Sequence, residues 1–157
     1  MVMGFTETAD KLMTPEIFIE YQGGIFVKFL FLAIGGTVGT LLRYLLSGFV
    51  SNLTKGIFPY GTLLINLIGA FLIGIFWGMS ARFEFSYEIK VFLFFGIFGS
   101  FTTFSTYTLE TINLFQDGEI KLAALNLIIS NLGGLVLVML GMMTARFFIV
   151  QIRSLIL

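Results

Sequence analysis

The chain has 157 residues, of which 57% are hydrophobic and only 11% are charged. Charged residues alone make up about a quarter of a typical soluble domain, so nine basic and nine acidic side chains could not cover this much apolar surface in water. This composition excludes a cytosolic enzyme, a nucleic-acid-binding protein and a secreted disulfide scaffold. Because Cys and His are absent, thiolate metal sites and imidazole bases are excluded as well. We therefore expect a membrane protein.

The N-terminal segment differs from the rest of the chain. Residues 1–24 hold four acidic residues and one lysine, and they lack the basic start and apolar core of a signal peptide. Thr14 followed by Pro15 is typical of a helix start, with Thr as the capping residue. We predict an N-terminal extension over residues 1–24, which is either a tail or a helix lying on the membrane surface.

Four membrane-spanning helices are predicted from the spacing of the charges. Uncharged stretches of 26, 19 and 24 residues cover 56–81, 91–109 and 122–145, and about 20 residues cross a bilayer as a helix. A further stretch near 25–47 qualifies if Lys28 and Arg43 near its ends are accepted. We predict helices over 26–47, 60–82, 88–115 and 119–148. Their short connections make neighbours antiparallel, which gives one transmembrane domain over 25–150 and a short tail over 151–157.

Polar side chains inside the second and fourth predicted helices form two stripes. Thr62 and Asn66 are four residues apart and share a face, as do Asn126 and Ser130. Asn131 follows directly but is expected to point about 100° away. These side chains either bond helix to helix or line a narrow hydrated track for a small ion. The glycine pairs Gly35/Gly39 and Gly74/Gly78 are expected to allow close helix packing instead.

The third predicted helix contains the strongest local signal. Residues 96–106 hold two glycines and five hydroxyl residues near the middle of the span, which predicts a break in the helix. Carbonyls freed at the end of the first half would suit Na⁺, and Thr102 or Thr103 would cap the second half. Phe104 and Tyr107 share a face of that half. Their ring edges carry positive potential, so with amide donors they can hold an anion without a full positive charge.

Two charges are set inside the ends of predicted spans. Arg43 is expected either to attract anions to one mouth of a pathway or to bind lipid phosphate. Glu110 would repel an anion, so we expect a structural or gating role for it. The balance of basic residues between the two sides favours a cytoplasmic N-terminus only mildly, which leaves the topology open.

Three motifs, in order over residues 26–150, resemble the Fluc/CrcB fluoride channel family. They are Gly35-Gly36-x-x-Gly39-x-x-x-Arg43-Tyr44, Pro59-x-Gly61-Thr62-Leu63-x-x-Asn66-x-x-Gly69 and Gly99-x-x-Thr102-Thr103-Phe104-Ser105-Thr106-Tyr107-x-x-Glu110. The resemblance implies an all-α membrane protein with four transmembrane helices per subunit and a third helix broken at mid-membrane. It also implies a fluoride-selective channel in the cell membrane that lets fluoride leave passively and so lowers its cytoplasmic toxicity.

The resemblance further implies an antiparallel, dual-topology dimer, formed with a second copy or with an oppositely oriented paralogue. A structural, non-transported Na⁺ would lie at its centre, held by the backbone carbonyls of Gly99 and Thr102. Inverted repeats meet at the midplane in transporters in the same way, and a single copy offers only half of such a site. The sequence does not decide between a homodimer and a heterodimer.

The resemblance also assigns roles to individual residues. Asn66 matches the pore asparagine and Phe104 the first aromatic of a phenylalanine pair. Tyr107 stands where the second aromatic is usually Phe, and Asn126 stands where Tyr is common. The remaining assignments are Thr62, Thr103 and Ser130 to the pore, and Arg43 and Glu110 to vestibule or structural positions.

Two other functions are compatible with four short helices. A proton-coupled exporter of organic cations would need an acid deep in a span, normally in the first helix, where this chain has Arg43 and no acid. A non-transporting membrane subunit would leave the hydroxyl-rich run unexplained. An enzyme is not expected, since no nucleophile–base pair or carboxylate dyad can be assembled.

Overall fold

The computed structural model describes the backbone of residues 15–156 and the side chains of residues 24–152. Most of the predicted N-terminal extension, and part of the predicted tail over 151–157, lie outside the described side chains. The described chain is all-helical. Its elements are α2 (Pro15–Thr54), α3 (Tyr60–Ser80), α4 (Tyr87–Lys90), the π-helix η1 (Val91–Phe98), α5 (Gly99–Phe101), α6 (Phe104–Gln116), α7 (Ile120–Ile128), the π-helix η2 (Ile129–Gly133) and α8 (Gly134–Ile156).

Four of the described helical stretches are long and apolar enough to cross a membrane. They cover Gly24–Thr54, Tyr60–Ser80, Tyr87–Gln116 and Ile120–Ile152. The expectation of four spans is thus confirmed for the described part of the chain. The second and third predicted helices agree with the structure to within two residues at each end.

The predicted bounds of the first helix are wrong, because α2 runs from Pro15 to Thr54 rather than from 26 to 47. Gly48 does not end the helix, since one glycine costs only about 1 kcal/mol in a helix interior and no proline follows before Pro59. The helix stops where Lys55 takes a left-handed backbone conformation with φ 44°. The fourth helix is also longer than predicted, with α8 reaching Ile156.

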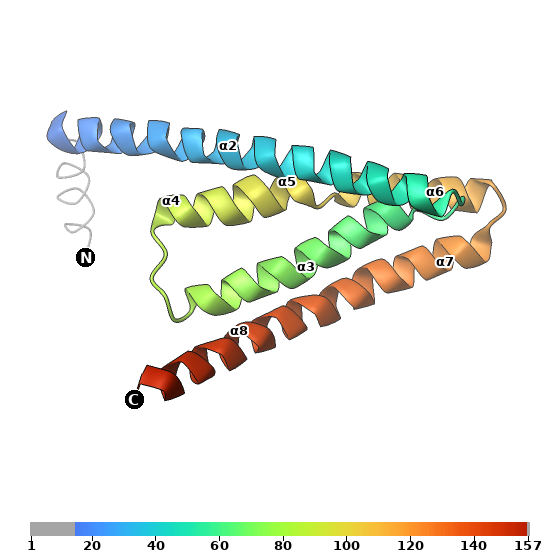
Figure 1. The fold of residues 1–157 in the computed structure, drawn as a ribbon. Helices are drawn as coiled ribbons and strands as arrows, with labels where there is room; N and C mark the ends of the chain where they lie inside the picture. The colour runs from blue at the N-terminus through green and yellow to red at the C-terminus, as the bar shows by residue number, and fades with distance from the viewer. Residues whose placement is uncertain (1–14, 157) are drawn as a thin grey trace, which may run out of the picture.

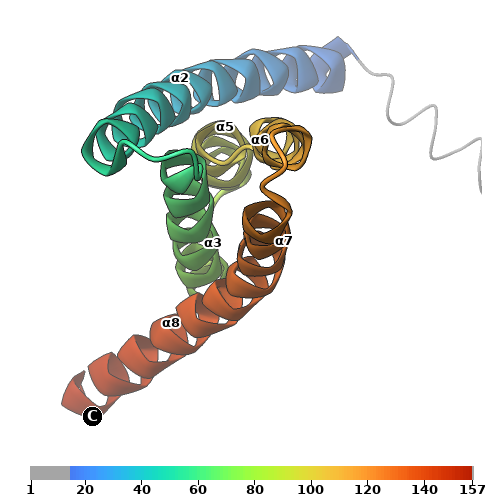
Figure 2. The ribbon, with the colours of Figure 1, turned by 90° about the vertical axis from the view of Figure 1, so that its right-hand side faces the viewer.

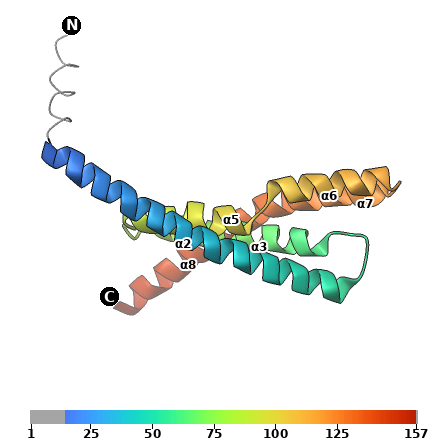
Figure 3. The same cartoon turned by 90° about the horizontal axis from the view of Figure 1, so that it is seen from above.

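The long helices run back and forth between two ends of the molecule (Figure 1). The N-terminal end of α2, the α3–α4 loop and the C-terminal end of α8 lie at one end, while the α2–α3 and α6–α7 loops lie at the other (Figure 1). In the end-on view, α3 lies between α2 and α8 (Figure 2), and it contacts α8 along much of its length. Seen from above, α6 and α7 run side by side, while the start of α2 and the end of α8 diverge (Figure 3). Consecutive helices are antiparallel, as their short connections require.

Glycines allow the closest of these helix contacts. A Cβ added at Gly35 would lie 2.6 Å from the carbonyl oxygen of Phe92 in η1, and one at Gly39 would collide with the carbonyl of Ile97. Gly74 meets the backbone of Val138 in α8 in the same way, and a Cβ at Gly78 would lie 2.8 Å from Cβ of Ala145. The predicted packing role of Gly35, Gly39, Gly74 and Gly78 is confirmed.

Candidate functional site

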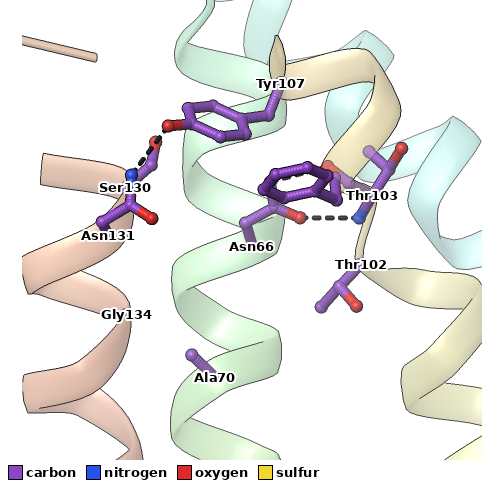
Figure 4. Close-up of a pocket in the computed structure, with 9 residues that line it drawn as sticks. Asn66, Ala70, Thr102, Thr103, Tyr107, Ser130, Asn131 and Gly134 are labelled. Atoms are coloured by element: carbon purple, nitrogen blue, oxygen red, sulfur yellow. Dashed lines mark hydrogen bonds between the residues drawn. The ribbon is translucent and has the colours of Figure 1, made fainter. Parts of the chain in front are cut away.

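A polar pocket of about 230 Å³ lies where α3, the α5–α6 junction and η2 meet (Figure 4). Most of the candidate pore residues line it, although they come from three different helices. The lining residues are Asn66, Ala70, Thr102, Thr103, Phe104, Tyr107, Ser130, Asn131 and Gly134. None of these side chains carries a formal charge.

The backbone of the third span changes conformation at the floor of this pocket. Thr102 (φ −83°, ψ 155°) and Thr103 (φ −145°, ψ 114°) are extended between the end of α5 and the start of α6. Thr103 is the N-cap of α6, and its hydroxyl oxygen accepts a hydrogen bond of 3.4 Å from the amide of Thr106. The sequence predicts a hydroxyl cap at Thr102 or Thr103, and the structure has it at Thr103.

Asn66 of α3 holds this extended segment through a two-point contact. Its Oδ1 accepts from the backbone amide of Thr103 at 2.8 Å, and its Nδ2 donates to the Thr103 carbonyl at 3.1 Å (Figure 4). The side-chain amide therefore replaces the helical partners that Thr103 lacks. Asn66 has a second Nδ2 hydrogen, to which no described residue gives an acceptor.

The same change frees backbone carbonyls. In a continuous helix the amide of Thr103 would bond the carbonyl of Gly99, and that of Thr106 would bond the carbonyl of Thr102. Instead these amides donate to Asn66 and to the hydroxyl of Thr103. Gly99 is exposed on the surface of the single chain. Carbonyl oxygens at the negative end of a helix dipole are ligands that hard cations accept, so the predicted pair Gly99 and Thr102 fits a Na⁺ site.

The two aromatic residues of α6 differ sharply in exposure. Phe104 is 74% exposed, whereas Tyr107 is 5% exposed. Their ring centroids lie 5.6 Å apart with the planes inclined at 58°. Both rings thus meet at the pocket, one at its open side and one in its wall.

Asn126 and Ser130 of the fourth span share a face as predicted, whereas Asn131 departs from its predicted direction. Asn126 is 1% exposed, and its Nδ2 donates to the hydroxyl of Thr111 at 2.8 Å, which ties α7 to α6. Ser130 donates to Asn126 Oδ1 over 3.3 Å. The expectation that Asn131 points away is wrong, because Asn131 lines the pocket and its Nδ2 donates to the Tyr107 hydroxyl at 2.7 Å.

The π-helix η2 explains this error. It covers Ile129–Gly133, and its i→i+5 bonds place more residues in each turn than an α-helix does. Successive side chains are therefore closer together around the helix axis, and Ser130 and Asn131 both line the pocket. Asn131 is the residue that sequence reasoning missed. The available signal was its side-chain amide next to Ser130, because polar side chains inside a membrane span usually have a functional role.

Thr62 and Glu110 lie beyond the pocket, nearer the α2–α3 loop. The hydroxyl of Thr62 donates to Glu110 Oε1 at 2.8 Å, while Oε2 is buried without a hydrogen-bond partner among the described residues. Glu110 also lines a second pocket, with Ser51, Asn113 and Asp117 among its other lining residues. Thr62 lies one turn of α3 from Asn66, on the same face of the helix.

Arg43 is not brought to this site. It lies on α2, half-buried, and lines a separate hollow with Thr40, Tyr44, Ser47 and Gly48. Among the side chains that the structure describes, no group of three or more acidic, His or Cys residues is placed to hold a metal ion.

Comparison with known proteins identifies the family. Residues 30–142 match the sequence profile of the family described as "CrcB-like protein, Camphor Resistance (CrcB)". The chain is a member of the CrcB family. The resemblance read from the three motifs is confirmed, and the match covers all four predicted spans, entirely or in large part.

Curated CrcB relatives cover most of the chain. A protein of Parabacteroides distasonis is 41% identical over 127 residues, which are 81% of this chain and 99% of the relative. A Salinibacter ruber protein is 44% identical over 78% of this chain and 92% of its own length, and a Geobacter metallireducens protein is 45% identical over 73% and 94%. All three are named "Fluoride-specific ion channel FluC".

Membership of the CrcB family settles two coarse expectations. Its curated relatives are named as channels, so the expectation that the chain is not an enzyme is confirmed. Membership of this channel family, together with the four apolar helices, shows that the chain is a multi-pass membrane protein.

Proposed function

We propose that this chain is a fluoride-selective channel that lets fluoride leave the cell passively across the cell membrane. The observation that carries the proposal is the uncharged polar pocket at the α5–α6 junction, where Asn66, Phe104 and Tyr107 meet. The names of the curated relatives support fluoride as the transported ion.

The chemistry of the pocket suits a small, strongly hydrated anion. The free Nδ2 hydrogen of Asn66 supplies one donor, and the ring edges of Phe104 and Tyr107 supply positive potential. Ring edges and neutral donors compensate for lost water without the deep binding that a lysine or arginine would cause. Such a lining allows the ion both to enter and to leave. Ser130 belongs to the same polar lining, and Thr62 lies one turn of α3 farther along. Glu110, which accepts a hydrogen bond from Thr62, keeps a structural or gating role in this proposal.

We further propose that two copies assemble in antiparallel orientation, giving a dual-topology dimer. The single chain exposes the Gly99 segment and the ring of Phe104, which supports a partner that covers this face. A copy inverted across the membrane would bring its own break to the same depth, as inverted repeats do. An oppositely oriented paralogue is the alternative partner.

A structural Na⁺ at the centre of this dimer completes the proposal. The carbonyls of Gly99 and Thr102 would hold it, because their helical donors are taken by Asn66 and by the Thr103 hydroxyl. When bound, the ion would supply positive charge that compensates the carbonyl oxygens of two helix ends facing each other. It would not be transported.

Fluoride efflux from liposomes containing the purified protein tests the function. We expect rapid fluoride release after a membrane potential is allowed to form, with little release of chloride from matched liposomes. Chloride release as fast as fluoride release would overturn the selectivity. When Na⁺ is replaced by a large organic cation, we expect slower fluoride efflux in the same assay. We also expect a lower melting temperature for the purified dimer in that medium. A protein that conducts and melts alike in both media has no structural Na⁺.

A further inference from the structure

The hydroxyl of Tyr107 has an unusual position for a tyrosine in an apolar span. The residue is only 5% exposed, yet it lines the pocket. Its hydroxyl points toward the polar side chains of η2 (Figure 4). Buried tyrosine hydroxyls normally find a hydrogen-bond partner, and the partner here is Asn131 at 2.7 Å.

The direction of this hydrogen bond is fixed by the backbone. Nδ2 of Asn131 also donates to the carbonyl oxygen of Leu127 at 2.8 Å. A flipped amide would place Oδ1 against that carbonyl oxygen, where two acceptors would face each other, so the network selects the observed orientation. Both Nδ2 hydrogens of Asn131 are then used, one on Leu127 and one on Tyr107.

It follows that the Tyr107 oxygen accepts rather than donates in this pair. Its own hydrogen must point elsewhere, and no described residue accepts it. The other hydroxyls of the pocket are occupied: Thr102 donates to the Phe98 carbonyl at 2.9 Å, Thr103 donates to Thr106 at 2.9 Å, and Ser130 donates to Asn126. Among the described side chains that line the pocket, the free donors are therefore the Tyr107 hydroxyl and the second Nδ2 hydrogen of Asn66.

We propose that the Tyr107 hydroxyl donates a hydrogen bond to the transported anion, and that Asn131 is the positioning residue that keeps its hydrogen turned toward the pocket. The inference rests on the proposed fluoride function. It adds a hydrogen-bond donor to the ring edges of Phe104 and Tyr107. A phenylalanine at position 107 would offer only its ring edge. Fluoride is a far stronger hydrogen-bond acceptor than chloride, so neutral donors in the lining of the pocket favour the smaller anion.

The test compares fluoride dependence of flux in three variants of the full-length protein in liposomes. Tyr107→Phe removes only the oxygen, and we expect the half-saturating fluoride concentration to rise about 10-fold, as for loss of a hydrogen bond to a charged group. Asn131→Leu leaves the hydroxyl free to rotate, and we expect a rise of about 3-fold. The double variant should match Tyr107→Phe, because Asn131 acts through Tyr107. The matched control is Tyr87→Phe, which removes the hydroxyl of an exposed tyrosine at the start of α4 and should behave as the unaltered protein.

A second measurement separates a donor from a structural tyrosine. Fluoride, but not chloride, should perturb the near-ultraviolet absorbance of tyrosine in the unaltered protein, and this perturbation should vanish in Tyr107→Phe. If the unaltered protein conducts fluoride while Tyr107→Phe keeps the same half-saturating concentration and the same perturbation, the donor role is overturned and the channel function stands. If Asn131→Leu adds a further loss in the Tyr107→Phe background, the positioning role is overturned. Absence of fluoride flux in the unaltered protein would overturn the proposed function itself.

Discussion

At the scale of single residues, Asn66 serves the backbone and the pocket at once. One oxygen and one hydrogen of its amide hold Thr103, and the other hydrogen remains for the pocket. Aspartate at this position would keep the acceptor for the Thr103 amide and lose both hydrogens. Asn66→Asp is therefore more informative than Asn66→Ala. It keeps the oxygen that accepts from the Thr103 amide and adds a negative charge to the lining of the pocket.

We predict that Asn66→Asp lowers fluoride flux about 100-fold or more, because a carboxylate in the lining of the pocket repels an anion strongly in a protein interior. The measurement is fluoride efflux from liposomes, with size-exclusion chromatography to verify assembly. Asn52→Asp, an exposed residue near the end of α2, is the control and should retain flux. Unchanged flux in Asn66→Asp would remove Asn66 from the path.

The sequence predicted part of this residue-scale arrangement. Thr62 and Asn66 were recognised because four residues separate them. A hydroxyl cap for the second half of the third span was predicted at Thr102 or Thr103, and the structure has it at Thr103. The two-point clamp on Thr103 was not predicted, since it joins residues 37 positions apart. Asn131 was placed on the wrong side because a π-helical turn leaves no distinct pattern in the sequence.

At the scale of elements, glycines determine how closely α2 can approach the third span. Gly39 lies against the carbonyl of Ile97, whereas Gly48 on the same helix has nothing within 4 Å of an added Cβ. Gly39 is therefore in close contact with the third span, whereas Gly48 has open space around it. Charge spacing predicted that these helices exist, but it did not predict their ends, because α2 continues through Gly48 to Thr54.

We predict that Gly39→Ala destabilises the protein by about 2 kcal/mol, the usual scale of overpacking in a filled contact. Gly48→Ala should leave the stability unchanged or slightly raised, since alanine favours helix more than glycine does. Thermal unfolding in detergent micelles measures both. Equal melting temperatures for the two variants would contradict the close contact at Gly39.

At the scale of the whole molecule, the described chain exposes large apolar side chains on every long helix. Examples are Phe29 on α2, Trp77 on α3, Phe95 on η1 and Phe147 on α8, each more than half exposed. Lipid covers such residues in a membrane protein, and a second copy covers those near the break in the proposed dimer. Both ends of the bundle carry basic residues, which leaves the orientation weakly specified.

We predict that the chain inserts in both orientations in the same membrane. The chain lacks cysteine, so Glu84→Cys in the α3–α4 loop and Asp117→Cys in the α6–α7 loop each introduce one thiol, both at exposed positions. A membrane-impermeant maleimide added to intact cells should label about half of each variant, with full labelling after detergent, if insertion is equal in both directions. Full labelling of one variant and none of the other would show a fixed topology.

The clamp of Asn66 on Thr103 also has a consequence for biosynthesis. Chains emerge from the ribosome with their N-terminal part first, so α3 is available before the extended Thr102–Thr103 segment enters the bilayer. Unbonded backbone groups are not tolerated in contact with lipid, and Asn66 stands ready to satisfy those of Thr103 on arrival. Because α3 precedes this segment in the chain, the hydrogen-bond partner of Thr103 is synthesised before Thr103 itself.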